Sequence, residues 1–165
     1  MPHESIMKLI DENEVRNLSH RYAQAIDRGD AVAWSALFTK DAEFKRAGRP
    51  PLPYEGILEL PATQLRRYAK TWHGVQTQNI TLHGEEAEGE VYCIARHIYT
   101  DYHNVPGVFP FSLVHDLLVR YQDVYRKEDG VWRIRSREIN IDLREVRQVT
   151  LFNGVVEPGD RAPSG

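Results

Sequence analysis

The first part of the chain carries hydrophobic residues at helical spacing. Residues 12–28 place apolar side chains at every third or fourth position, from Val15 to Ile26, with polar side chains between them. This pattern predicts an amphipathic helix. Gly29 ends that helix, and residues 31–38 predict a second, shorter one.

A proline-rich stretch follows these two helices. Residues 41–45 favour a short strand, whereas residues 46–53 contain three prolines and a glycine. Such a segment predicts a loop that holds neither a helix nor a strand ladder. Helical spacing returns in residues 56–71, where Pro61 indicates that the helix restarts.

From residue 75 onward the hydrophobic period changes to two, which is typical of strands joined by turns in an antiparallel meander. The predicted strands are residues 75–83, 90–102, 115–126 and 131–143. Residues 104–110, with Phe109, predict a rim or lid over a pocket, a subunit contact or a plain irregular connection. Helices followed by a sheet indicate an α+β domain whose sheet can curl around the helices and leave a hollow.

Composition narrows the choice of function. The chain has 165 residues, enough for one domain with a sizeable core, and we expect residues 1–150 to form it and residues 151–165 to be a partly mobile tail. A net charge of −3 argues against nucleic acid and membrane surfaces as partners. Cys93 is the only cysteine, so we expect no internal disulfide and no cysteine-based zinc site. We expect a cytoplasmic protein, with no targeting or spanning segment.

Four segments together carry a resemblance to a known family. They read RYAQAIDRGD, WSALFTKDAEF, HGVQTQNITL and DVYRKEDGVWRIRSREI. Across residues 10–145 the chain resembles the SnoaL-like proteins of the nuclear transport factor 2-like superfamily. The resemblance implies a cone-shaped, curved, mostly antiparallel sheet wrapped around N-terminal helices and enclosing a pocket. This fold hosts dehydratases, dehydrochlorinases, cyclases, isomerases and binding modules, so function must be argued from the site.

Asp27 and His73 match the catalytic aspartate and histidine of members such as scytalone dehydratase, bile acid dehydratase and hexachlorocyclohexane dehydrochlorinase. A neutral imidazole is well suited to take a proton near pH 7, and a carboxylate on its other nitrogen fixes the tautomer. The alternative is a solvated aspartate at a helix end and a partly buried histidine before a strand. Ile26 and Arg28 flank Asp27 where scytalone dehydratase has a tyrosine, which favours a bacterial-type pattern.

The resemblance implies roles for three further residues. Tyr22 lies five residues before Asp27, as the bile acid dehydratase tyrosine does, although this spacing puts the two about 140° apart on a helix and leaves core packing as an alternative. His97 falls near a second pocket histidine, or is a satisfied core residue. Arg137 matches a dehydrochlorinase arginine that could hold an anionic leaving group. The alternative is a solvated strand face, because Arg137 shares strand parity with Arg133 and Arg135.

The substrate-binding candidates are large aromatic residues, namely Trp34, Phe44, Trp72, Phe109 and Phe152. No histidine spacing matches a metal site, and we expect neither a metal nor a cofactor. We therefore predict a cofactor-independent dehydratase acting on a small cyclic or polycyclic carbonyl compound, and a homodimer or homotrimer. The alternatives are a polyketide cyclase or isomerase using the same pocket, and a non-catalytic ligand-binding or dioxygenase small-subunit-like module.

Overall fold

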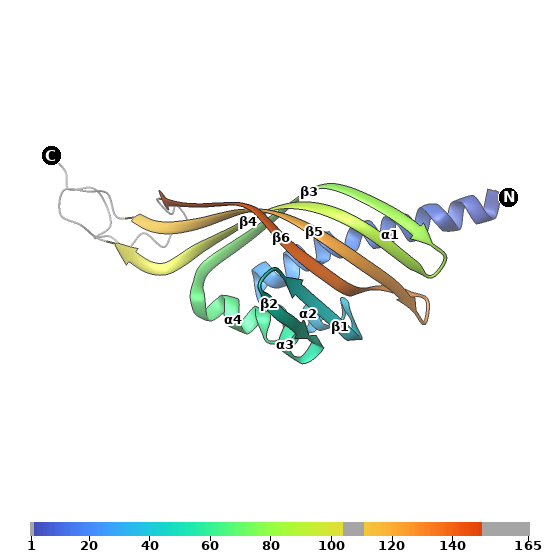
Figure 1. Ribbon diagram of the computed structural model, residues 1–165, viewed down its shortest axis with the longest axis horizontal. Coiled ribbons are helices and arrows are strands. Elements are labelled where there is room, and N and C mark those ends of the chain that lie inside the picture. The colour runs from blue at the N-terminus through green and yellow to red at the C-terminus, as the bar shows by residue number, and fades with distance from the viewer. Residues whose placement is uncertain (1, 104–110, 150–165) are drawn as a thin grey trace.

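The computed structural model describes residues 2–103 and 111–149 (Figure 1). The predicted rim segment with Phe109 and the predicted tail with Phe152 lie outside these residues. The helices are α1 (Pro2–Arg28), α2 (Ala31–Ser35), α3 (Tyr54–Leu58) and α4 (Leu60–Arg67), and the strands are β1 (Phe38–Arg46), β2 (Arg49–Pro53), β3 (Tyr68–His83), β4 (Glu86–His103), β5 (Phe111–Glu128) and β6 (Val131–Val149).

Helix α1 is longer than its hydrophobic pattern predicted. Its buried stripe starts at Val15, as expected, but the helix itself begins at Pro2. The early turns extend past the β3–β4 hairpin (Figure 1), and Leu9 there is 66% exposed. Because these turns bury no apolar face, the hydrophobic spacing does not mark them as helical. The helix ends at Gly29, whose φ of 65° lets the backbone N–H of Asp30 bond to the carbonyl of Ala25 at 2.9 Å.

The predicted third helix is two helices and the start of a strand. The restart at Pro61 is confirmed, because this proline lies in the first turn of α4, where a missing N–H costs no hydrogen bond. The expected end at Thr71 is wrong. Helix α4 ends at Arg67, since residues from Tyr68 onward pair with β4, beginning opposite Tyr99.

The prediction that residues 46–53 hold no strand is also wrong. Strand β2 pairs with β1, with Phe44 opposite Leu52. Prolines are tolerated there because β2 lies at the edge of the sheet and needs hydrogen bonds on one side only.

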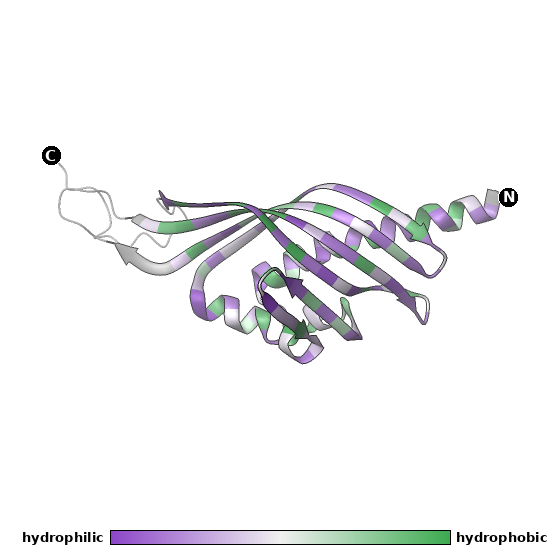
Figure 2. Ribbon diagram, viewed as in Figure 1, coloured by the Kyte–Doolittle hydropathy of each residue, from purple (hydrophilic) through white to green (hydrophobic). Residues whose placement is uncertain are grey.

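Within the described residues, one curved, unclosed sheet runs in the order β2-β1-β6-β5-β4-β3. Neighbouring strands are antiparallel except β1 and β6, which are parallel. Hydrophobic and polar residues alternate along the strands (Figure 2). We call the face that packs against α1 the inner face, and the core lies between the two. The predicted α+β architecture is confirmed.

Strand β6 departs from simple alternation at a β-bulge. Trp132 and Ile134 are buried on the inner face, and then Arg135 is an extra residue, because Tyr125 pairs with Ile134 but its neighbour Val124 pairs with Ser136. The next inward side chain is therefore that of Arg137, which is fully buried. Arg137 and Arg133 therefore do not share a face, as their strand parity predicted, because the bulge reverses the alternation between them.

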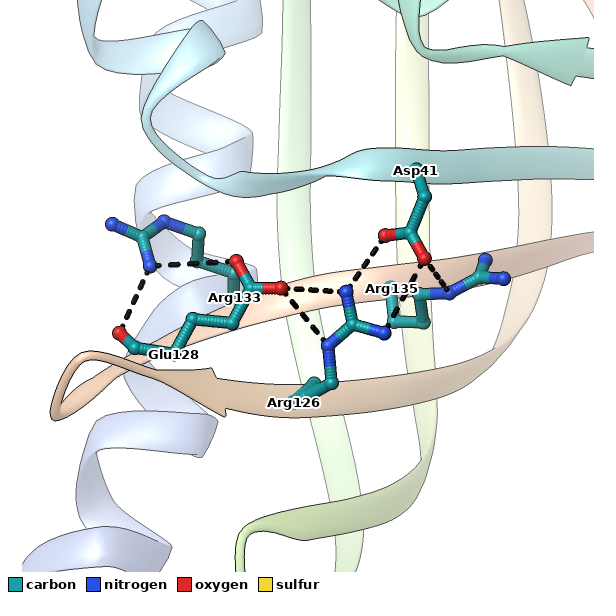
Figure 3. A network of polar contacts seen from close by, with 5 residues as sticks. All are labelled: Asp41, Arg126, Glu128, Arg133 and Arg135. Carbon is teal, nitrogen blue, oxygen red and sulfur yellow. Dashed lines mark hydrogen bonds and ion pairs between the residues drawn. The ribbon is translucent and has the colours of Figure 1, made fainter.

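Arg126, Arg133 and Arg135 lie in a surface network at the β5–β6 hairpin (Figure 3). Asp41 on β1 accepts from Arg126 at 2.8 Å and forms an ion pair with Arg135 at 3.0 Å. Glu128 pairs with Arg126, and its backbone carbonyl accepts from Arg133 at 3.2 Å. The network ties β1 to the β5–β6 hairpin, and its arginines lower the pKa of Asp41 to about 2.

A second bulge in β6 repeats the pattern of the first. Leu118 pairs with Leu143 and Val119 with Ile141, so Asp142 is the extra residue. Its carboxylate turns to the outer face and accepts from Arg120 at 2.6 Å. After this bulge, the inward positions of β6 begin at Arg144.

Candidate active site

The end of α1 and the start of β3 bring Asp27 and His73 into contact. Nδ1 of His73 lies 2.6 Å from Oδ1 of Asp27, and the backbone N–H of His73 donates to Oδ2 at 2.8 Å. Thr71 donates its hydroxyl to Oδ1 at 2.8 Å. Thr71 and His73 are two apart in a strand, so both point to the same side and reach the same carboxylate.

These contacts keep Asp27 charged and fix the histidine tautomer. Burial raises the pKa of Asp27, but the hydrogen bonds from His73 and Thr71 and the nearby imidazole outweigh burial, and the pKa lies below its ordinary value. A carboxylate cannot donate, so Nδ1 of His73 must carry the proton. The neutral ring then has its lone pair on Nε2, the state that a general base requires.

Tyr22 shares this region with His73 despite its unfavourable spacing from Asp27. The two rings lie edge to face with centroids 6.4 Å apart, because β3 crosses the helix end and carries His73 to the side of α1 that faces the core. Tyr22 is 6% exposed, and burial raises its pKa even though Arg137 opposes this effect. Its phenol therefore stays protonated at neutral pH.

Arg137 occupies the core rather than an open pocket wall. It forms a two-pronged ion pair with Asp123 at 2.6 and 2.8 Å, and both side chains are completely buried. Its guanidinium lies between the rings of Tyr22 and Tyr121, 4.1 and 4.0 Å from their centroids. Tyr125 donates to Asp123 at 2.7 Å. The arginine is thus committed to holding two tyrosine rings in place.

His97 extends the polar region away from Asp27. Its ring is 5.4 Å from that of His73 and 6.3 Å from that of His115. Burial, followed by the nearby His73 and His115, lowers the pKa of His97 to about 4, so it is neutral near pH 7. Its Nδ1 is buried with no hydrogen-bond partner in the described part of the chain.

The structure separates the aromatic candidates. Trp34 and Phe44 are buried, with ring centroids 4.7 and 6.3 Å from that of Tyr22, and the indole N–H of Trp34 donates to the carbonyl of Ile57 at 2.8 Å. Trp72 is 61% exposed on the outer face, where the guanidinium of Arg96 lies 5.5 Å from its ring.

Neither thiol chemistry nor a metal cluster is apparent in the described residues. Burial raises the pKa of the Cys93 thiol to about 11, which keeps it protonated. Residues 2–103 and 111–149 contain no group of three or more histidine, cysteine or acidic side chains placed to hold a metal ion. In the same residues, no helix has both the length and the apolar character needed to cross a bilayer.

A profile of the SnoaL-like domain matches residues 7–138 of the chain, which is most of its length. The protein belongs to the SnoaL-like family. Among curated proteins, none matches it in sequence.

Several solved structures share the fold of this SnoaL-like protein. A protein from Novosphingobium aromaticivorans, provisionally assigned as a scytalone dehydratase, has a TM-score of 0.75 at 19% identity, covering 93% of this chain and 98% of its own. A type 2 hexachlorocyclohexane dehydrochlorinase also has a TM-score of 0.75, at 16% identity, covering 94% and 99%. A provisionally assigned aromatic ring hydroxylase from N. aromaticivorans has a TM-score of 0.71 at 20% identity, covering 86% and 94%. At these identities the likeness shows the fold.

The candidate site also contains residues that were not predicted from the sequence. Thr71 was assigned to a helix, so its shared face with His73 was not apparent. Asp123 lies at the same strand parity as Tyr121 and Tyr125, and a charged residue within a buried stripe is a signal for a paired ion. His115 faces His97 directly across β4 and β5, a pairing that sequence alone does not give.

Proposed function

We propose that the protein is a cofactor-independent dehydratase that acts on a small cyclic or polycyclic carbonyl compound. The contact between Nδ1 of His73 and Oδ1 of Asp27 carries this proposal, because it pairs an oriented imidazole with a carboxylate held by two further hydrogen bonds. Such a pair suits abstraction of a proton from carbon next to a carbonyl.

In the proposed reaction, Nε2 of His73 takes the proton alpha to the carbonyl, and Asp27 stabilises the imidazolium that forms. The electron pair of the broken C–H bond passes into the enolate. It then forms the new double bond as the hydroxyl on the neighbouring carbon leaves. The departing hydroxide takes the proton back from His73, which releases water and restores the neutral ring.

Tyr22 and His97 support the two charges that develop. The protonated phenol of Tyr22 donates to the enolate oxygen, where one well-placed donor is worth roughly 100- to 1,000-fold in rate. His97, neutral at pH 7, donates a ring N–H to the leaving hydroxyl. Arg137 acts through Tyr22, whose ring it contacts.

Proton abstraction is tested separately from loss of water. Deuterium exchange into 1-tetralone in D₂O, followed by NMR, reports abstraction alone, and conversion of 3-hydroxy-1-tetralone, followed by mass spectrometry, reports dehydration. We expect the wild type to catalyse both reactions. His73→Ala should lower both rates roughly 100- to 10,000-fold, and Asp27→Asn should also be severe because the amide no longer fixes the required tautomer.

His83→Ala is the matched control, since this histidine is exposed at the far end of β3. Retention of wild-type rates by His73→Ala would refute the assignment of the base. Exchange without loss of water would replace dehydration by isomerisation or cyclisation in the same site.

A further inference from the structure

Two cross-strand rows of side chains lie on the inner face between β3 and β6. Residues directly opposite each other in antiparallel strands point to the same side, so the pairing register defines each row. The first row is His73, Ala95, Leu117 and Arg144, and the second is Thr71, His97, His115 and Val146. The proposed base and Arg144 therefore stand at opposite ends of one row.

The second row holds buried nitrogens that lack partners. His97 is 6% exposed and His115 is 9% exposed. Nδ1 of His97 and both ring nitrogens of His115 have no hydrogen-bond partner in residues 2–103 and 111–149. A buried polar group without a partner is costly, so a cluster of such groups marks a place where a ligand can supply the missing bonds.

Two arginines lie beside these histidines. Arg144 is the diagonal neighbour of His115 on the inner face, because it pairs with Leu117, two residues along β5. Arg67, at the end of α4, places its guanidinium 5.3 Å from the ring of Tyr68, which in turn lies 4.7 Å from the ring of His97. Both arginines are exposed, and neither has a carboxylate partner among the residues that the structure describes.

The charges around His115 leave this end of the row positive. Burial, then Arg144 and Arg67, lower the pKa of His115, whereas Asp116 raises it. Asp116 is on the outer face and is already bound by Arg96 and Arg147 at 3.1 and 3.0 Å.

We propose that Arg67 and Arg144, together with a ring N–H of the buried His115, form a subsite for a carboxylate on the substrate. Guanidinium groups bind carboxylates through paired, charge-assisted hydrogen bonds. The β3 and β6 ends of the first row are three strand spacings apart, roughly 14 Å between backbones. This proposal rests on the proposed function, which places the reacting carbon at the His73 end of the row. The substrate is then a ring compound with a carboxylate opposite the carbon that loses its proton.

Benzoate and benzamide provide a matched pair of probes, since they share their shape and differ in charge. Histidine labelled with ¹³C allows binding to be followed at the ring signals of His97 and His115 by NMR. We expect benzoate to bind at least about tenfold more tightly than benzamide, because charge-assisted hydrogen bonds are roughly twice as strong as neutral ones. Benzoate should also raise the pKa of His115, since a negative charge nearby favours the protonated ring.

Two double variants with the same charge change separate the subsite from general electrostatics. Arg67→Gln/Arg144→Gln should lose about tenfold or more in benzoate affinity and leave benzamide binding within about twofold. Arg21→Gln/Arg66→Gln removes two exposed arginines on α1 and α4 that lie away from this row, and it should keep the preference for benzoate. Equal affinities for the two probes, no benzoate binding, or an equal loss in both double variants would overturn the subsite.

The same titration in His73→Ala distinguishes this proposal from the proposed reaction. The preference for benzoate should persist there, because the subsite does not include His73. If benzoate is preferred but the exchange rate does not depend on His73, the subsite is kept and His73 is rejected as the base. If the preference is absent but exchange depends on His73, the base is kept and the subsite is rejected.

Discussion

Asp27 depends on its neighbours for both its charge and its orientation. It accepts from the Thr71 hydroxyl, the His73 backbone and the His73 ring, and these bonds outweigh the effect of burial on its pKa. Of the three donors, Thr71 is the one that does not belong to the base itself. It can therefore be removed without altering the imidazole.

Thr71→Val tests this positioning role. The variant keeps the shape of the side chain but loses a hydrogen bond to the carboxylate, so the pKa of Asp27 should rise. Because a protonated Asp27 no longer orients His73, the acid limb of the rate-against-pH profile should move to higher pH, and the exchange rate should fall about tenfold.

Thr63→Val is the control, because that hydroxyl only accepts from Arg66 on the exposed side of α4. An unchanged acid limb in Thr71→Val, or an equal shift in the control, would contradict the positioning role.

At the residue scale, the sequence selected two residues that the structure places in contact, but it did not select the residues around them. The family resemblance selected Asp27 and His73, and the structure brings them together. It could not select Thr71 or His115, whose importance depends on strand boundaries and on cross-strand pairing. Arg137 was selected for a leaving anion, whereas its visible partner is Asp123, which lies 14 positions away in the chain on a neighbouring strand.

At the scale of the elements, β4 has a glycine beside the buried Arg137–Asp123 ion pair. Gly89 lies directly opposite Asp123. A Cβ atom at position 89 would lie 2.5 Å from Cδ1 of Ile80 and 3.0 Å from Cε2 of Tyr125, the tyrosine that donates to Asp123. The Tyr125 ring is completely buried and has little space to move.

Gly89→Ala should therefore lower the free energy of unfolding by about 1–3 kcal/mol, the usual cost of overpacking a core. Urea denaturation measures this change. Gly74→Ala is the matched strand control, since its Cβ would meet only ordinary contacts at 3.6 Å or more. It should stay within about 0.5 kcal/mol of the wild type. Equal stability of Gly89→Ala and wild type would show that the ring relaxes freely.

The hydrophobic pattern located the long strands and the restart at Pro61 because both depend on local chemistry. It missed β2, where three prolines argue for a loop and only the edge position permits a strand. It also extended α4 to Thr71, because tertiary pairing with β4 overrides the helical spacing there.

For the molecule as a whole, buried histidines couple stability to pH. Unfolded, His97 would bind a proton near pH 6.5, whereas in the folded protein its pKa is about 4. Between these values the unfolded chain holds more protons, so stability should rise with pH and be lost as pH falls from 6.5 toward 4. The lowered pKa of His115 acts in the same direction.

His97→Gln should flatten this dependence by roughly 3 kcal/mol at most across the window. Urea denaturation at a series of pH values measures the slope, and His83→Gln, at an exposed position, should keep it. A variant slope as steep as that of the wild type would rule out His97 as its source.

The homodimer or homotrimer stays a prediction. The described outer face exposes apolar side chains that include Tyr92 and Leu118, which is compatible with burial against another copy.

The two extra residues of β6 make the length of this strand as important as its composition. Arg135 and Asp142 are each held outside by an ion pair, and after each of them an arginine turns inward. Removing one of these extra residues would leave the order of inner and outer side chains intact downstream. Removing a regular residue farther from the bulges would instead invert the side chains between the deletion and the next bulge. Single-residue deletions along β6 would therefore differ far more in their consequences than substitutions at the same sites.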